Sequence, residues 1–253
     1  MKRFAVLLYG TTSYAIFFAT FLYAIGFLAN AVVPKTIDSG APGSVLGALA
    51  VNFALLGVFA LQHSVMARID FKRWWTRYVP QPVERSTYVL ASSLAMILLF
   101  AAWQPLPGVI FSVEHPIARD LITGLFCTGV LLVLYSTFLI DHFDLFGLRQ
   151  SWLYFRGTEY SDKNFVTPSL YKYVRHPLYV GWFITFWATP DMTWGHLLMA
   201  IGTTSYILVA IVFEERDLLR QLGSDYRQWR ETTPMFFPSL RGKRSQPERE
   251  VAA

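Results

Sequence analysis

The segment 171–181, YKYVRHPLYVG, places an arginine, a histidine and three tyrosines at the start of an apolar stretch. Pro177 suits the first turn of a helix, because its missing N–H costs nothing there and the residue before a proline is pushed toward extended geometry. A helix is therefore expected to begin at His176. Free backbone N–H groups and the helix dipole at such a start favour an anion, and Arg175 and His176 would add hydrogen bonds to it. The alternative is membrane anchoring, since Arg and Tyr commonly flank spanning helices.

Two carboxylates, Glu214 and Glu215, directly follow the last apolar segment of the chain. Carboxylates that adjoin an apolar helix are costly unless they are paired or functional. An ion pair with Arg175 is the structural interpretation, and ligand binding is the functional one. The two ends of a helical hairpin converge. Under either interpretation, Glu214 and Glu215 therefore lie at the same membrane face as Arg175 and His176, at the lip of an apolar cavity. This composition favours an amphiphilic, zwitterionic cofactor.

The elements that must position these residues are membrane helices. The chain has 253 residues, of which 54% are hydrophobic and 15% charged, which is too apolar for a soluble domain of this size. A spanning helix needs about 20 mainly apolar residues. Uncharged segments of this kind occupy 4–34, 39–67, 86–113, 121–140 and 192–213, and a shorter one occupies 177–190. The prediction is an all-α polytopic membrane bundle with about six crossings, in which 177–213 forms a C-terminal helical hairpin.

A single membrane-embedded domain is expected over residues 1–240, because the sequence shows no internal repeat and no interdomain linker. The hairpin and the ligand-binding region fall at about 156–234, and the polar tail 241–253 is expected to be disordered. The first apolar segment exceeds the roughly 7–15 residues of a signal-peptide core, so it is expected to remain as an anchor. The single Cys127 allows no disulfide within the chain and is expected to be a buried structural thiol.

The net charge of +5 is explained better by membrane topology than by nucleic-acid binding. Basic residues are concentrated near the N-terminus, in the loops 68–85 and 149–175, and after residue 215. The positive-inside rule places these regions, and both termini, in the cytoplasm. A hairpin that begins and ends in the cytoplasm agrees with this topology.

Several stretches of the chain resemble a known superfamily. "RHPLYVG" (175–181), two apolar helices and then "EERDLLRQLGSDYRQWRETTP" (214–234) resemble the C-terminal half of the isoprenylcysteine carboxyl methyltransferase superfamily. The stretches "LQHSVMAR" (61–68), "ERSTYVL" (84–90) and "STFLIDHFDLFGLRQ" (136–150) are similar to the bacterial methanethiol S-methyltransferases within it. This second likeness extends through most of the chain.

The resemblance implies transfer of a methyl group from S-adenosylmethionine to methanethiol, giving dimethyl sulfide, at a cytoplasm-facing site in a bacterial plasma membrane. It assigns cofactor binding to the stretch before the hairpin, a tyrosine, the His-Pro-x-Tyr segment and a glutamate. These positions are Lys163, Asn164, Phe165, Val166, Tyr171, His176, Pro177, Leu178, Tyr179 and Glu214. Arg175 is added to the predicted cofactor-binding residues because it lies at the expected start of the helix. Prenylcysteine enzymes hold the substrate carboxylate with an arginine where this chain has Ala210, which argues against a prenylated acceptor.

A thiol acceptor raises the question of a base, because the thiolate is the nucleophile. General-base assistance contributes about 100-fold to 10,000-fold. The candidate catalytic residues are His63, Asp141 and His142, which end apolar segments at the face expected for the hairpin mouth. A satisfied interfacial histidine is the alternative for His63. No metal is expected, since the spacing of these residues matches no closed zinc pattern.

Three other functions are compatible with the sequence. The same donor site would serve methylation of a lipid amine or of another thiol. A non-catalytic transporter or ligand-binding membrane protein would use the hairpin mouth as an anion site. A membrane reductase would bind NADPH, although the chain has no glycine-rich dinucleotide fingerprint. The expected partners are thus a small thiol and the lipid bilayer, with no nucleic acid.

Overall fold

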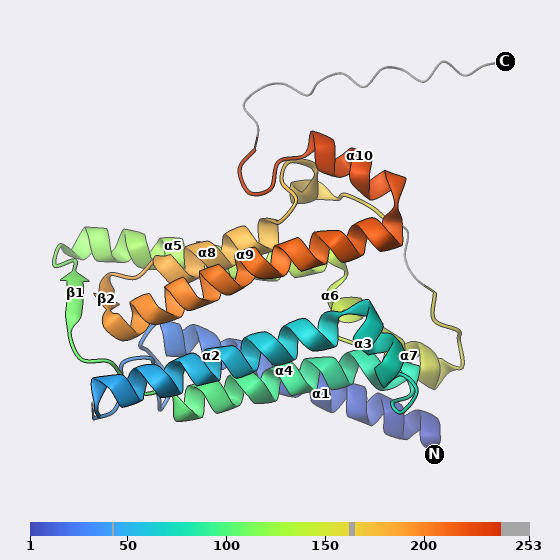
Figure 1. The fold of residues 1–253 in the computed structure, drawn as a ribbon, viewed down its shortest axis with the longest axis horizontal. Helices are drawn as coiled ribbons and strands as arrows, with labels where there is room; N and C mark the ends of the chain where they lie inside the picture. Colours follow the sequence, from blue (N-terminus) through green and yellow to red (C-terminus); the bar gives the residue numbers. More distant parts are fainter. Residues whose placement is uncertain (42, 162–164, 239–253) are drawn as a thin grey trace.

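The computed structural model describes residues 1–41, 43–161 and 165–238, which form a bundle of long helices (Figure 1). Five helices in these ranges are long and apolar enough to cross a membrane. They are α1 (Lys2–Leu28), α2 (Val45–Ala67), α4 (Gln81–Ala102), α5 (Pro116–Ile140) and α9 (Trp194–Leu222). A helix rises about 1.5 Å per residue, so even the 22 residues of α4 span the roughly 30 Å of a hydrocarbon core. The prediction of an all-α membrane bundle is confirmed. The predicted polar tail 241–253 lies outside the described residues.

The C-terminal hairpin consists of one short helix and one long helix. α8 (Pro177–Trp187) has 11 residues, about half of what a spanning helix needs, so the described residues contain five helices of spanning length where about six crossings were expected. A three-residue strand, β2 (Asp191–Thr193), connects it to α9. α9 continues nine residues beyond the apolar segment that ends at residue 213, so Glu214 and Glu215 lie inside the helix rather than after it.

The helices form two groups. α1 and α2 both pack against α4, whereas α5 and α9 both pack against α8 (Figure 1). The N-terminus and the short helices α3 (Ile69–Trp75), α7 (Leu148–Arg156) and α10 (Ser224–Thr232) lie at one end of the bundle (Figure 1). β2 and its partner strand β1 (Val109–Ser112) lie at the other, which is called the sheet end below.

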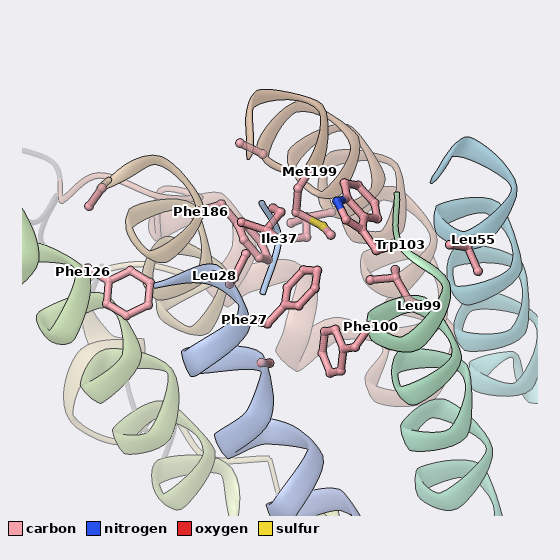
Figure 2. Close-up of a cluster of buried hydrophobic side chains, with 14 of the residues drawn as sticks. Phe27, Leu28, Ile37, Leu55, Leu99, Phe100, Trp103, Phe126, Phe186 and Met199 are labelled. Atoms are coloured by element: carbon pink, nitrogen blue, oxygen red, sulfur yellow. The ribbon is translucent and has the colours of Figure 1, made fainter. Parts of the chain in front are cut away.

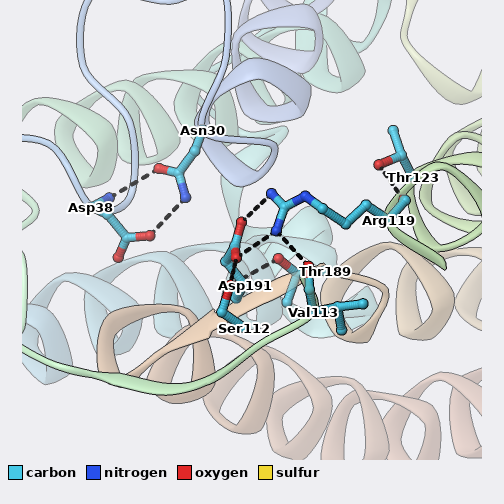
Figure 3. Close-up of polar contacts among 8 residues, drawn as sticks. All are labelled: Asn30, Asp38, Ser112, Val113, Arg119, Thr123, Thr189 and Asp191. Carbon is cyan, nitrogen blue, oxygen red and sulfur yellow. Dashed lines mark hydrogen bonds and ion pairs between the residues drawn. The ribbon is translucent and has the colours of Figure 1, made fainter. Parts of the chain in front are cut away.

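The two-stranded antiparallel sheet is a feature that the sequence analysis did not predict. It pairs Ser112 with Asp191 and Val109 with Thr193. Arg119 donates to both carboxylate oxygens of Asp191, at 2.8 and 2.6 Å, and the Ser112 hydroxyl donates at 2.5 Å (Figure 3). These hydrogen bonds hold the pKa of Asp191 at about 2. The sheet and its ion pair therefore join the α4–α5 connection to the α8–α9 connection.

The main apolar core lies close to the sheet end. Phe27, Leu99 and Trp103 are almost completely buried there, and Phe186 of α8 and Met199 of α9 pack into the same cluster (Figure 2). These residues come from the ends of their helices that are nearest to the strands. The two helix groups are thus held together by apolar packing at the sheet end, which leaves polar residues to face one another toward the opposite end.

The single cysteine differs from its predicted environment. Cys127 is exposed on α5, whereas the adjacent Phe126 is buried. Consecutive residues of a helix point about 100° apart, so the face of α5 that carries Cys127 is directed away from the bundle. In a spanning helix this face meets lipid, and the prediction of a buried thiol is wrong.

Two glycines allow α5 and α8 to approach each other closely. A Cβ atom at Gly129 would lie 2.7 Å from the Thr185 Oγ1 atom and 2.9 Å from the Gly181 carbonyl oxygen. At Gly181 it would lie 2.8 Å from the backbone nitrogen of Val133. Small residues at such contacts are the usual means of close helix packing in a membrane. The position of α8, and of the residues at its N-terminus, depends on this contact.

We expect Gly129→Ala to lower the free energy of unfolding by about 1–3 kcal/mol, because the added methyl group overpacks the α5–α8 contact. Gly124→Ala in the same helix is the matched control, since a Cβ there meets no atom within 4 Å. The control variant should be as stable as the parent protein or slightly more stable. Thermal unfolding of both variants in detergent measures the difference. Equal unfolding temperatures would contradict the packing described above.

Candidate active site

The start of α8 is fixed by the chain segment that follows α10. Pro177 is the first residue of the helix, as predicted, and His176 precedes it. The backbone N–H groups of Arg175 and His176 donate to the carbonyl oxygens of Pro234 and Met235, at 2.9 and 3.1 Å. His176 is buried beneath this contact. The two ends of the hairpin and the C-terminal segment therefore meet at one place.

Glu215 is the centre of a buried group of charges, called here the Glu215 cluster. Its Oε1 atom lies 3.0 Å from Arg175 Nε and 3.1 Å from His176 Nε2, and its Oε2 atom lies 3.0 Å from Arg230 Nε. Arg175 also donates to the carbonyl oxygen of Arg230 at 2.8 Å. The cluster joins α8, α9 and α10, so the structural interpretation of the carboxylate pair applies to Glu215.

Glu214 has a different environment. It is partly exposed, and its Oε2 atom accepts a hydrogen bond from the Tyr179 hydroxyl at 2.6 Å. It also interacts electrostatically with Tyr88 and Tyr206. Burial and the Glu214 carboxylate together raise the pKa of Tyr171. One tyrosine thus contacts this carboxylate and three others, from different elements, lie within electrostatic range of it, and the four are called the tyrosine cluster below.

Phe165 borders the same region from the segment before the hairpin. Its ring contacts those of Tyr226 and Trp229, with centroids 6.0 and 5.4 Å apart. The Trp229 indole N–H donates to the Tyr171 carbonyl oxygen at 3.2 Å. The Tyr226 hydroxyl is buried and has no hydrogen-bond partner in the part of the chain that the structure describes. Of the other predicted cofactor residues, Val166 is exposed and Leu178 partly exposed, whereas Lys163 and Asn164 lie outside the described residues.

His63 on α2 reaches the tyrosine cluster through Tyr88. The Tyr88 hydroxyl lies 2.9 Å from His63 Nε2, and the Ser92 hydroxyl lies 3.2 Å from His63 Nδ1. The His63 ring also contacts that of Tyr206, whose hydroxyl accepts from Ser64 at 3.3 Å. Sequence reasoning missed the roles of Tyr88 and Tyr206, because a single tyrosine in an apolar helix gives no periodic signal.

The other two candidate catalytic residues lie elsewhere at this end of the bundle. His142, in the short helix α6 (His142–Leu145), is buried, and burial lowers its pKa. Its ring nitrogens contact the hydroxyls of Tyr14 and Thr137, both at 2.8 Å. Asp141 caps α6 by accepting from the Asp144 backbone N–H. The structure therefore brings His63 to the tyrosine cluster and places His142 against Tyr14 of α1, with Asp141 as the cap of the same short helix.

The residues around Glu214 suit S-adenosylmethionine by their chemistry. A carboxylate accepts hydrogen bonds from an ammonium group or from ribose hydroxyls. Tyrosine faces attract a cation such as a sulfonium. Aromatic rings at Phe165 and Trp229 suit a planar base, and the unpaired Tyr226 hydroxyl offers it a hydrogen bond. These residues thus offer partners for the ammonium, ribose, sulfonium and adenine groups of such a cofactor.

Spanning helices, together with a carboxylate and tyrosines at the open end of a hairpin, define a polytopic membrane protein with a polar site at one end. A model of the isoprenylcysteine carboxyl methyltransferase (ICMT) family matches residues 128–219. The matched residues run from α5 to α9 and include the start of α8 and both glutamates. The class of the protein is therefore that of the membrane methyltransferases.

Curated relatives match nearly the whole chain. The methanethiol S-methyltransferase of Mycobacterium tuberculosis is 52% identical over 94% of this chain and 98% of its own length. The methanethiol S-methyltransferase 2 of Bradyrhizobium diazoefficiens is 52% identical over 98% of this chain and 95% of its own. The methanethiol S-methyltransferase of Crocosphaera subtropica is 52% identical over 97% of this chain and 96% of its own length. No solved structure matches the chain. The chain belongs to the methanethiol S-methyltransferase family.

Proposed function

We propose that the protein methylates methanethiol with S-adenosylmethionine and releases dimethyl sulfide. The observation that carries this proposal is the position of Glu214, a partly exposed carboxylate surrounded by tyrosines within the segment that the family model matches. The names of relatives that match over nearly their full length support the choice of acceptor. The apolar product would leave through the bilayer without an exit path of its own.

When bound, the cofactor would supply a methyl group on a positively charged sulfur. The thiolate attacks the methyl carbon, and the cofactor sulfur leaves from the opposite side. We assign the polar groups of the cofactor to Glu214 and the hydroxyl-bearing Tyr171 and Tyr179. We propose that the adenine ring of the cofactor binds beside Phe165 and the rings that Phe165 contacts. The remaining predicted residues complete the proposed site: Lys163, Asn164, Val166, Arg175, His176, Pro177 and Leu178. Of these, Arg175 and His176 act by holding the start of α8 through Glu215.

Position 210 of α9 carries no charge for a substrate carboxylate, because the residue there is alanine. Ala210 lies one turn before Glu214 and one turn after Tyr206, so the three residues share one face of α9. A prenylcysteine would have to bury an unpaired anion here, whereas a small neutral thiol would not.

We place the site on the cytoplasmic side of a bacterial plasma membrane, with both termini on that side. The site lies at the end of the bundle that carries the N-terminus, α3 and α10 (Figure 1). The basic loops 68–85 and 149–175 belong to this end, and positively charged loops stay in the cytoplasm.

We expect purified protein to convert methanethiol to dimethyl sulfide and to transfer little methyl to a farnesylcysteine analogue. Headspace detection of the sulfide, beside transfer of labelled methyl to each acceptor, measures both reactions. Titration of the purified protein with S-adenosylhomocysteine and with NADPH shows which cofactor binds, independently of which acceptor is methylated. Efficient labelling of the prenylated acceptor without volatile sulfide would overturn the acceptor assignment alone. Binding of NADPH with no response to S-adenosylhomocysteine would end the methyltransferase proposal.

A further inference from the structure

Two histidines at the site end of the bundle have the same arrangement of partners. In each, Nδ1 faces a Ser or Thr hydroxyl and Nε2 faces a tyrosine hydroxyl: Ser92, His63 and Tyr88 form one set, and Thr137, His142 and Tyr14 form the other. The sets differ in their surroundings and in one contact, because the Tyr88 hydroxyl also lies 3.1 Å from His63 Nδ1. A comparison between them therefore separates local hydrogen bonding from function.

The hydrogen bonds of Ser92 determine which nitrogen of His63 carries the proton. The Ser92 hydroxyl donates to the Tyr88 carbonyl oxygen at 3.0 Å, so its oxygen is left to accept from His63 Nδ1. A neutral His63 that donates to Ser92 carries its proton on Nδ1, and Nε2, the ring nitrogen nearer to the Tyr88 hydroxyl at 2.9 Å, is then left to accept from it. The Tyr88 oxygen in turn keeps lone pairs with which to accept a proton from a third group.

The position of Tyr88 shows which third group this is. The rings of Tyr88 and Tyr206 both contact that of His63, with centroids 5.1 and 6.3 Å apart, and both tyrosines interact electrostatically with Glu214. Tyr88 therefore faces the proposed cofactor site from α4, while Tyr206 and Glu214 face it from α9. His63, Tyr206 and Glu214 each keep part of their surface accessible, although they lie between the two helix groups. Tyr14, in contrast, packs among Phe18, Phe143 and Phe146. Of the two sets, the one at His63 meets the proposed reaction.

We infer that Tyr88 accepts the proton of the substrate thiol and passes its own hydroxyl proton to His63. This inference rests on the proposed methyl transfer and adds to it the route of the proton. The S–H bond of the thiol breaks as its proton moves to the Tyr88 oxygen, while the Tyr88 O–H proton moves to His63 Nε2. The sulfur then bonds to the methyl carbon, and the bond from that carbon to the sulfonium breaks with its electron pair going to the cofactor sulfur.

The charge of the site is conserved along this route. One positive charge leaves the sulfonium and one appears on His63, which later releases its proton to water. Burial, and to a smaller extent Arg85 and Arg68, oppose a lasting charge on His63, while Glu214 interacts electrostatically with Tyr88 and Tyr206. Burial and the arginines therefore favour rapid return of His63 to the neutral form that the next cycle needs.

The test compares Tyr88→Phe and His63→Gln with the parent protein on two acceptors, methanethiol and the more acidic 2,2,2-trifluoroethanethiol. A general base matters most for the acceptor that is mostly protonated near neutral pH. We expect both variants to lose about 100-fold in turnover of methanethiol at saturating donor. The loss with the fluorinated thiol should be far smaller. Affinity for S-adenosylhomocysteine should be unchanged.

Tyr14→Phe is the matched control, because it removes the equivalent hydroxyl from His142 and should leave the turnover of both thiols unchanged. Equal losses on both thiols in Tyr88→Phe would show a structural role and overturn the inference. Full methanethiol activity in either variant of the His63 set would overturn it as well. Failure of the proposed function itself would be seen separately, since the parent protein would then produce no dimethyl sulfide.

Discussion

Replacing Glu214 with glutamine is expected to weaken binding of S-adenosylhomocysteine by about 10- to 100-fold. Hydrogen bonds to a charged group contribute about 1.5–3 kcal/mol, and each 1.4 kcal/mol is a factor of ten in affinity. Glutamine keeps the size of the side chain but removes the charge and one acceptor. Calorimetric titration measures the affinity, and the yield of dimethyl sulfide should fall with it at limiting donor.

Tyr179→Phe is the control for this change, because it removes the hydroxyl that donates to Glu214 and leaves the carboxylate in place. It should weaken the same binding less than Glu214→Gln does. Glu214 is partly exposed, so neither variant should lower the unfolding temperature appreciably. Unchanged affinity in Glu214→Gln would mean that the cofactor is bound at another place.

The sequence was sufficient to predict that the two ends of the hairpin converge, because a chain that enters and leaves a membrane at one face has no other choice. It was not sufficient to assign separate tasks to Glu214 and Glu215. Adjacent residues in a helix point about 100° apart, and only the rotation of α9 decides which of them meets Arg175. Arg230 reaches Glu215 because the chain turns at Gly223, where φ is +60°; a glycine there signals the end of α9 but not the direction that α10 then takes.

The surroundings of His63 and His142 could not be predicted from the sequence either. The sequence placed His63 and His142 near one membrane face from the lengths of the apolar segments. Their contacts with Tyr88 and Tyr14 join residues 25 and 128 positions apart, and such long-range packing leaves no trace in spacing. The strands β1 and β2 were missed for a related reason. Each has only three or four residues, and their pairing joins two connections that are remote in sequence.

Replacing Glu215 with alanine is expected to destabilise the protein rather than to alter binding in the folded molecule. The side chains of Glu215, His176 and Arg175 are 6, 6 and 11% exposed, so removal of the carboxylate leaves a buried guanidinium unpaired. Breaking a buried pair in this way costs about 3–5 kcal/mol. Arg230 is 43% exposed and can turn to solvent, which favours the lower end of this range. The loss should be visible as a lower unfolding temperature in detergent and a smaller yield of folded protein.

The two glutamates thus form a matched pair of adjacent positions with opposite expected effects. Glu214→Ala should leave stability nearly intact and remove donor binding, whereas Glu215→Ala should lower stability and reduce activity only in proportion to the unfolded fraction. Glu215→Gln should fall between, because the amide keeps one acceptor for Arg175 and loses the charge. A reversed result, with Glu214→Ala unstable and Glu215→Ala stable but unable to bind the cofactor, would exchange the roles assigned to the two residues. Contacts other than those of Arg175 and His176 with Glu215 would then have to hold the start of α8. The measurement of stability therefore tests the geometry of the site independently of its chemistry.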